Sequence, residues 1–505
     1  MYKSDNIVPD NLKMALRQAT IPLEDVPASK QDWHPGSDGK VLDLVHPALY
    51  PLLYGRSRIL LDDFVPLSQC AQYTGKGEIL PLPKPEELHD GQRVREEVMY
   101  WRLHPKVVYS SRFQWLPCEV DFDEDGTVKI ASYVNNLHPV KHRDLYPVIE
   151  QIVAKAIPLW NATLSSTMNS IMRLFKPARI EVSYPEYINT ELPPHLENKP
   201  PMHSSSPSGV SEEEIDLEAV SDEEMDPEDL DEARDEWIRE HRVLVQPEPR
   251  PYTERVHHGE AEDSTTMFFP KDVDLRRDFG DDGLQVIVKL ANIHLTPEKS
   301  SYDGGSWHIE GSLNEHICAT ALYYYDCENI TDSYLAFREA MSTYKLEDMP
   351  YEQSEYEHFE KLYNIEQNGP GIQELGRVLT KEGRLLVFPN VLQHRVQSFR
   401  LADPTRPGHR KILALFLVDP HTRIPSTANI PPQQQDWWRE MALSLDRVAD
   451  LPPELAEHVL DSAGDFPISL DEAKKLRLEL MEERKGFVEE VDKKMHEATF
   501  NFCEH

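Results

Sequence analysis

The chain has 505 residues, of which 39% are hydrophobic, and it carries a formal net charge of −36 at pH 7. This length is enough to bury a large core and to form about two or three domains. The strong negative charge argues against a nucleic-acid backbone or an anionic membrane surface as the main partner.

The cysteines and the first residues indicate where the protein resides. The five cysteines include no Cys-x-x-Cys pair and their number is odd, which predicts a reducing compartment and no structural zinc site. The opening stretch MYKSDNIVPDNLKMALRQAT lacks the apolar segment of a secretion signal, and no run approaches the length of a membrane span. We therefore expect a cytoplasmic protein, with the nucleus as the alternative location.

Residues 1–200 mix strand-like and helix-like patterns. The runs FQWLPCEVDF and TVKIASYVNNL flank the acidic turn Asp123–Gly126, a typical hairpin signal. The following run, DLYPVIEQIVAKAI, has apolar residues at helical spacing. Together with the proline-rich start, these patterns predict an α+β region that wraps over a core.

Residues 201–262 form a strongly acidic insert. Between residues 211 and 240 there are 16 acidic and two basic residues. Such a segment cannot bury enough apolar surface to offset its chain entropy, so we expect a disordered insert. Its end, LDEARDEWIRE, has the composition of a short helix. The insert serves either as a solvated spacer or as the docking surface of a protein partner.

Residues 263–435 have the pattern of an antiparallel β core. The strand-like runs are, in order, LQVIVKLANIHL, SWHIEG, HICATALYYYD, GRLLVFPN, HRVQSF and RKILALFLVD. Glycine, proline and asparagine separate them, which is typical of a sandwich or jelly roll. A polar, helix-prone insert is expected at 327–376. Residues 436–505 are predicted to be helical, and Ser469 is the expected cap of the last helix.

One His-x-acid pair stands out from a background of chance pairs. Random placement of 21 His and 89 acidic residues in 505 positions gives roughly four such pairs, so the pattern alone has no value. The sequence has five, which begin at His142, His195, His258, His308 and His358. Only the pair at His308 follows a double glycine and lies on a strand-like run.

Residues i and i+2 of a strand point to the same side, so His308 and Glu310 should project together. Further along, GRLLVFPNVLQHRVQSF is a buried strand, a break at Pro389, and a second strand that begins at His394. The sequence therefore supplies two imidazoles and one carboxylate on strands of the same predicted core. Such a ligand set binds divalent transition metals, iron(II) among them.

These segments resemble a known family. GSWHIEG, GRLLVFPNVLQHRV and RKILALFLVDP together are similar to the double-stranded β-helix of iron(II)/2-oxoglutarate-dependent oxygenases. The resemblance implies a jelly-roll or cupin-like core with flanking helices and a long N-terminal region. It also implies that His308, Glu310 and His394 bind iron(II).

The resemblance further implies a binding site for the cosubstrate. A basic residue on the strand after the distal histidine holds the far carboxylate of 2-oxoglutarate, because a guanidinium donates two parallel hydrogen bonds. Arg410 is the candidate, and Arg400 is its rival. Asn292, on the first strand of the core, is a candidate for a second cosubstrate contact.

From WRLHPKVVYSSRFQWLPCEVDF to STANIPPQQQDWW the chain also resembles a large fungal family known as a domain of unknown function.

The expected activity is that of a dioxygenase that oxidises, and most commonly hydroxylates, a small molecule, an amino acid or a peptide. 2-Oxoglutarate would be decarboxylated to succinate, and ascorbate would serve as a reductant. Two alternatives stay open from the residues themselves. One is a non-catalytic β-helix scaffold that binds a partner, and the other is a divalent-metal hydrolase using the same three ligands.

Overall fold

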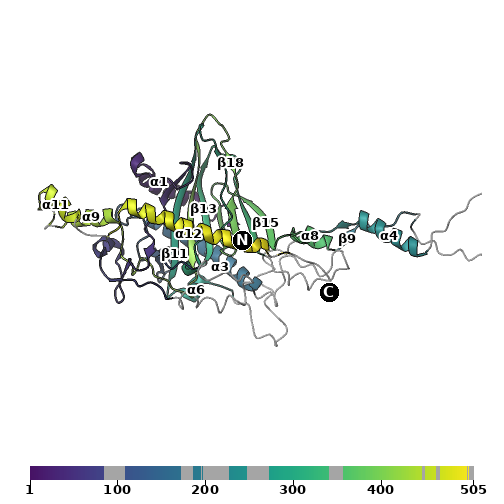
Figure 1. Ribbon diagram of the computed structural model, residues 1–505, viewed down its shortest axis with the longest axis horizontal. Coiled ribbons are helices and arrows are strands. Elements are labelled where there is room, and N and C mark those ends of the chain that lie inside the picture. Colours follow the sequence, from purple (N-terminus) through teal and green to yellow (C-terminus); the bar gives the residue numbers. More distant parts are fainter. Residues whose placement is uncertain are drawn as a thin grey trace, which may run out of the picture. The chain divides into compact units, whose positions relative to one another are not determined.

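A computed structural model describes residues 1–84, 109–171, 186–194, 196, 227–246, 272–340, 356–445, 448, 450–461, 467–497 and 499. The chain divides into two compact units. The larger is formed by Met1–Lys176, His258–Ser342 and Asn368–Asn501, and the smaller by Pro177–His257, Thr343–Gln367 and Phe502–His505. The predicted α+β class is confirmed, because helices surround antiparallel sheets in the larger unit (Figure 1). None of the described helices is long and apolar enough to cross a membrane.

The large sheet of the larger unit has the strand order β1-β16-β13-β19-β11-β7-β8, and β2 also pairs with β11. Every neighbouring pair is antiparallel. Its strands are β1 Tyr2–Ser4, β2 Val41–Val45, β7 Cys118–Phe122, β8 Val128–Ile130, β11 Leu284–Leu295, β13 Ile317–Glu328, β16 Leu385–Pro389 and β19 Gly408–Val418. The predicted hairpin is present, since β7 and β8 flank a turn in which Gly126 has a φ of 78°.

A small sheet, in the order β15-β14-β17, forms the second layer. Its strands are β14 Tyr334–Ala340, β15 Ile372–Leu379 and β17 Gln393–Val396. An isolated antiparallel bridge between His308 and His394 extends this sheet beyond β17. Among the described residues there are also four short strand pairs, formed by β3 Leu52–Leu53 with β6 Phe113–Gln114, β4 Arg58–Ile59 with β5 Glu78–Ile79, β12 Ser301–Tyr302 with β18 Phe399–Arg400, and β9 Tyr187–Ile188 with β10 Val243–Leu244.

The core between the sheets follows from the alternation of side chains along each strand. On β19, Ala414 and Phe416 belong to the cluster between the sheets, whereas Leu413 and Leu415 belong to the cluster on the other face. From the small sheet, Phe337 makes an edge contact with Phe388, with ring centroids 5.0 Å apart. Each fully buried aromatic side chain of this kind contributes roughly 1.5–3 kcal/mol of transfer free energy.

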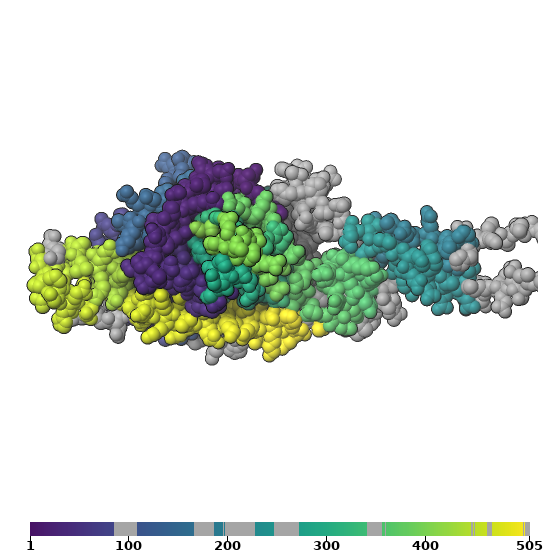
Figure 2. Space-filling view, turned by 90° about the horizontal axis from the view of Figure 1, so that it is seen from above, coloured from purple at the N-terminus to yellow at the C-terminus, as the bar shows by residue number. Residues whose placement is uncertain are grey.

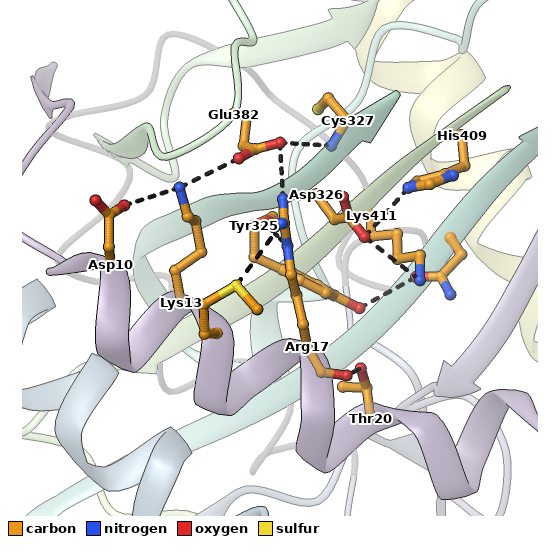
Figure 3. A network of polar contacts seen from close by, with 12 residues as sticks. Asp10, Lys13, Arg17, Thr20, Tyr325, Asp326, Cys327, Glu382, His409 and Lys411 are labelled. Atoms are coloured by element: carbon orange, nitrogen blue, oxygen red, sulfur yellow. Dashed lines mark hydrogen bonds and ion pairs between the residues drawn. The ribbon is translucent and has the colours of Figure 1, made fainter. Parts of the chain in front are cut away.

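Helices α1, Asp10–Glu24, and α3, Tyr146–Ile171, cover the outer face of the large sheet. A polar network ties α1 to the ends of the strands (Figure 3). Arg17 of α1 donates to the Tyr325 carbonyl at 3.0 Å and forms ion pairs with Asp326 at 2.9 Å and Glu382 at 2.7 Å. The N-terminal segment thus lies against the core strands, as the space-filling view from above shows (Figure 2).

The C-terminal residues are helical, as predicted. The helices are α9 Gln435–Leu443, α11 Pro453–Asp461 and α12 Leu470–Glu497. The Ser469 hydroxyl accepts a hydrogen bond from the Glu472 N–H at 3.3 Å, which confirms the expected cap. Ala473 and Leu480 of α12 belong to the cluster between the sheets, so this helix closes one side of the core (Figure 1).

Two expectations about the segments need correction. The insert at 327–376 is not helical throughout, because β13 continues to Glu328, β14 follows, and β15 begins at Ile372. Helix-favouring residues in the run YLAFREA adopt a strand because Leu335 and Phe337 fill the core from alternate positions. The region 1–200 is also not a separate layer over the core, since β1, β2, β7 and β8 are strands of the large sheet.

Within the smaller unit, the expected short helix is present as α4, Pro227–His241. This unit also contains α8, Glu357–Tyr363. The described part of the larger unit also contains a short helix, α6, Leu275–Phe279, and the 3₁₀ helices Ala28–Lys30, Leu67–Tyr73 and Leu313–Glu315. Residues 201–226 and 247–262 of the acidic insert lie outside the described residues.

The ion pair that fastens β1 to the sheet predicts a pH-dependent contribution to stability. Arg384 donates to both carboxylate oxygens of Asp5, at 2.6 and 2.9 Å, and Lys381 lies 2.9 Å away. The Arg384 hydrogen bonds hold the pKa of Asp5 well below its usual range. A depressed pKa stabilises the fold above the unfolded value of about 3.9, and this contribution is lost as the pH falls through the folded value.

We therefore expect Asp5→Ala to lower the free energy of unfolding at pH 7, and the difference from the wild type to shrink below about pH 4. Urea denaturation at pH 7, 5 and 3 measures this difference. Asp62→Ala is the matched control, because Asp62 is exposed and forms no ion pair among the described residues. A difference that is constant with pH would contradict the role of the ion pair.

Candidate metal centre

Two backbone hydrogen bonds bring the predicted histidines together. The His308 N–H donates to the His394 carbonyl at 3.1 Å, and the His394 N–H donates to the His308 carbonyl at 2.9 Å. The two imidazole rings lie side by side, with centroids 4.4 Å apart. Gly304 makes this approach possible, because its φ is 101° and a Cβ there would lie 2.8 Å from the Val396 carbonyl oxygen.

Glu310 completes the group from the same side of the strand. Its Oε1 lies 3.8 Å from His308 Nε2 and 3.3 Å from His394 Nε2. Asn390, which directly follows β16, holds the Glu310 backbone from both sides. The Asn390 Oδ1 accepts from the Glu310 N–H at 2.9 Å, and its Nδ2 donates to the Glu310 carbonyl at 2.8 Å.

The hydrogen bonds determine which ring nitrogen of His308 is free. Its Nδ1 lies 2.9 Å from the Ser306 carbonyl, which can only accept, so Nδ1 carries the proton. Burial, with the neighbouring His394, lowers the pKa of His308 to about 4, and the ring is therefore neutral at pH 7. The lone pair of Nε2 consequently faces the carboxylate.

Glu310 is ionised under the same conditions. Burial alone would raise the pKa of Glu310, but the contact with His394 and the electrostatic influence of His308 and Lys289 lower it to about 2. One atom from each of the three side chains lies within 4.8 Å of the other two. Two imidazoles and a carboxylate that converge in this way fit a divalent metal ion, so the three residues form a possible metal-binding triad.

The environment of the triad is closed on one side and open on the other. The His394 side chain is 4% exposed, and it packs against Phe388 and Phe337 at centroid distances of 4.8 and 6.2 Å. Its Nδ1 has no acceptor among the described residues. The His308 side chain is 36% exposed, so a ligand can reach the triad from its side.

Arg410 is buried in the same layer between the sheets. It pairs in register with Ile293, and alternation along β19 places it on the face of Ala414 and Phe416. Its Nη1 donates to Ser333 Oγ at 2.6 Å and to Thr380 Oγ1 at 3.4 Å. In the part of the chain that the structure describes, no carboxylate lies within 4 Å of this guanidinium.

The remaining surroundings of Arg410 are aromatic. Its guanidinium carbon lies 5.0 Å from the centroid of Phe399 and 5.7 Å from that of Tyr324. A buried, permanent charge with hydroxyl and ring contacts but no acid is a ready site for an anion. Arg400, the rival candidate, is exposed at the end of β18.

Asn292 lies on the opposite face of the sheet. Its Nδ2 donates to Glu24 of α1 at 3.0 Å, and its Oδ1 accepts from the Tyr325 hydroxyl at 3.3 Å. Asn292 therefore joins β11 to the helix on the outer face, and it is not part of the proposed site.

Of the other His-x-acid pairs, those at His195 and His258 begin outside the described residues.

Sequence reasoning missed a second group of possible ligands, formed by His34, Asp43 and His46. His46 Nδ1 accepts the Ala48 N–H at 3.1 Å, so the proton of the neutral ring is on Nε2 and that nitrogen has no lone pair for a metal. Arg477 of α12 lies 3.7 Å from Asp43 and already provides a cation. This group is better explained as a hydrogen-bonded link between β2 and α12. No motif spacing reveals it, because the chain must fold back at the Trp33–Leu42 bridge to form it.

The two hydrogen bonds between the Asn390 side chain and the Glu310 backbone predict that the metal affinity depends on Asn390, although Asn390 is not a ligand. We expect Asn390→Ala to weaken the binding of Mn(II) or Fe(II) by about tenfold, because the hydrogen bonds from Asn390 to the Glu310 backbone hold the Glu310 side chain in the orientation that binds the metal. Anaerobic isothermal titration calorimetry measures this affinity. Asn329→Ala is the matched control, since the Asn329 amide also donates to three backbone carbonyls, at Asp403, Arg406 and Pro407. Equal affinities in the two variants would contradict the role of Asn390.

Comparisons with solved structures give only distant similarities. IDO from Bacillus thuringiensis is 12% identical, with a TM-score of 0.18 over 28% of this chain and 52% of that one. A bsmA homolog from Methylobium petroleophilum PM1 is 14% identical, with a TM-score of 0.17 over 35% and 57%. The Fe(II)/(alpha)ketoglutarate-dependent dioxygenase TqaL is 14% identical, with a TM-score of 0.17 over 32% and 48%.

The chain thus spans about half the length of each of these structures. No curated protein sequence matches the chain. A family profile, in contrast, matches residues 1–441. The chain therefore belongs to the family described as "Protein of unknown function (DUF4246)".

Proposed function

We propose that this protein is an iron(II)- and 2-oxoglutarate-dependent dioxygenase. The observation that carries the proposal is a pair of sites in one layer between two sheets. The first is the group of His308, Glu310 and His394, whose ligand atoms lie within 4.8 Å of one another. The second is Arg410, a buried cation without an acidic partner among the described residues.

The strand order supports a double-stranded β-helix. Along the chain, β11 belongs to the large sheet, the bridge at His308 to the small sheet, and β13 to the large sheet again. Strands β14 and β15 are in the small sheet, β16 in the large, β17 in the small and β19 in the large. This alternation between facing sheets is that of a jelly roll, in which the His308 and His394 segments meet at one end.

The donor set suits iron(II). Two imidazoles and one carboxylate on one face of the ion leave positions open for other ligands. Iron(II) bound there would supply the activation of dioxygen. The protein's own residues position the metal: Asn390 orients Glu310, and the Ser306 carbonyl fixes the tautomer of His308.

Arg410 would bind the far carboxylate of 2-oxoglutarate. Its charge compensates that of the carboxylate, and the hydroxyls of Ser333 and Thr380, which already contact its guanidinium, are further donors. Decarboxylation of 2-oxoglutarate to succinate would accompany oxidation of a second substrate.

The proposed cosubstrate site is tested by removing the positive charge of Arg410. We expect Arg410→Gln to weaken 2-oxoglutarate binding by about 10- to 100-fold, which corresponds to the loss of charge-assisted hydrogen bonds. Titration calorimetry of the Fe(II)-loaded protein without oxygen measures the affinity, and succinate formation with oxygen and ascorbate measures turnover.

Two further variants complete this test. Arg400→Gln removes an exposed arginine of the same region and should leave the affinity unchanged. His308→Ala should abolish succinate formation, because it removes a metal ligand. If the wild-type protein binds Fe(II) but binds 2-oxoglutarate no more tightly than Arg410→Gln does, the proposed function is wrong.

A further inference from the structure

Helix α12 places a half-buried arginine, Arg484, beside the turn that follows the His308–Glu310 segment. The Arg484 Nη2 donates to Glu315 Oε1 at 2.6 Å, and the same oxygen accepts from the Trp115 N–H at 2.8 Å. Glu315 itself is fully buried in the turn that follows the His308–Glu310 segment. This helix lies C-terminal to residues 1–441, which the family profile matches.

The guanidinium of Arg484 stacks on Trp115. Its central carbon lies 3.7 Å from the centroid of the indole ring, and this ring in turn stacks on Phe416, with centroids 5.8 Å apart. Phe416 belongs to the cluster between the sheets, so Arg484 and Trp115 border the interior layer. The indole ring restrains the flat face of the guanidinium, and the hydrogen bond to Glu315 restrains its edge. Together the two contacts hold the guanidinium in one orientation.

Three buried donors around this contact have no acceptor among the described residues. They are Arg484 Nη1, Trp115 Nε1 and the hydroxyl of Tyr109. A buried donor without an acceptor lowers the stability of the fold, so a group of three in one region is unusual in a native protein. Tyr109 packs in one cluster with Ile309, which lies between two of the triad residues.

The balance of charges in this region also favours the binding of an anion. Burial lowers the pKa of Arg484, and the carboxylates of Glu315 and Glu310 oppose that change, so the guanidinium lies within electrostatic range of the triad. Lys289 of β11, half-buried, forms no ion pair in the described part of the chain, and its charge acts on both His308 and Glu310. With a divalent metal bound, the positive charges here would outnumber the carboxylates.

We propose that the second substrate is an organic acid, and that Arg484 Nη1 and Trp115 Nε1 bind its carboxylate beside the metal centre. This inference rests on the proposed function and names the substrate class for the same site. The carboxylate supplies an acceptor for the free donors, and its negative charge balances Lys289 and the metal. Arg484 is thus a substrate-binding residue, distinct from Arg410, which binds the cosubstrate.

The test compares acids with their uncharged amides. The probes are amino acids, N-acetylated amino acids and aromatic carboxylic acids, each beside its own carboxamide. Ligand-observed NMR is recorded on the protein loaded with Fe(II) and 2-oxoglutarate in the absence of oxygen. We expect one or more acids to bind and the matching amide to bind at least about tenfold more weakly.

Two variants assign the interaction to the proposed donors. Arg484→Gln and Trp115→Phe should each weaken the binding of that acid, by about tenfold for Arg484→Gln, while the affinity for 2-oxoglutarate stays at the wild-type value. Trp115→Phe keeps an aromatic ring on Phe416, so it remains informative if Arg484→Gln destabilises the fold by leaving Glu315 unpaired. Lys485→Gln is the control on α12, because Lys485 is exposed.

Several results would overturn the inference. They are equal binding of acids and amides, the absence of binding by any acid, unchanged acid affinity in both variants, or a loss of 2-oxoglutarate affinity in Arg484→Gln. The last result would mean that Arg484 holds the cosubstrate. Fe(II) and 2-oxoglutarate affinities of the wild type are measured separately, so failure of the proposed function is recognised independently of the acid–amide comparison.

Discussion

The reciprocal backbone hydrogen bonds between His308 and His394 are the constraint on which the site depends. They join two segments that are far apart in the chain, and they extend the small sheet at the point where the two imidazoles must meet. Gly304 is necessary because the segment passes close to the Val396 carbonyl. Asn390 then places Glu310 from the end of β16. The ligand geometry is therefore determined by backbone pairing, which is more rigid than loop conformation.

Among the described residues, the buried Arg384, Arg410 and Arg477 and the half-buried Arg484 fall into two groups. Arg384 and Arg477 make two-oxygen ion pairs with Asp5 and Asp32, and these pairs fasten the N-terminal segment and α12 to the core. Arg410 has no such partner among the described residues, and Arg484 keeps one nitrogen free. Burying charge or donors without acceptors lowers stability, so their persistence between the sheets indicates sites for anions. Both proposals follow from this contrast.

Much of the fold could be predicted because its strands are long and apolar. The runs that define β11, β13, β16 and β19 are visible in the sequence, since buried strands need continuous β-branched and aromatic residues. The segment YLAFREA was harder, because its alanines, arginine and glutamate favour a helix and only its packing against the core makes it strand β14. Propensity is a weak local effect, and burial of Phe337 outweighs it.

The sequence by itself determined the chemistry available to the site: two histidines and a glutamate on strand-like runs, followed by an arginine on the last strand. Only the tertiary structure decided which side chains share a face. The run LQVIVKLANIHL is apolar on both faces, so alternation could not show that Asn292 faces α1 while its neighbour Ile293 shares the face of Arg410. A shift of one residue in register reverses every side chain, and register is set by long-range pairing. The group of His34, Asp43 and His46 and the contact of Arg484 with Trp115 also depend on residues that are brought together only by folding, so no local sequence pattern predicts them.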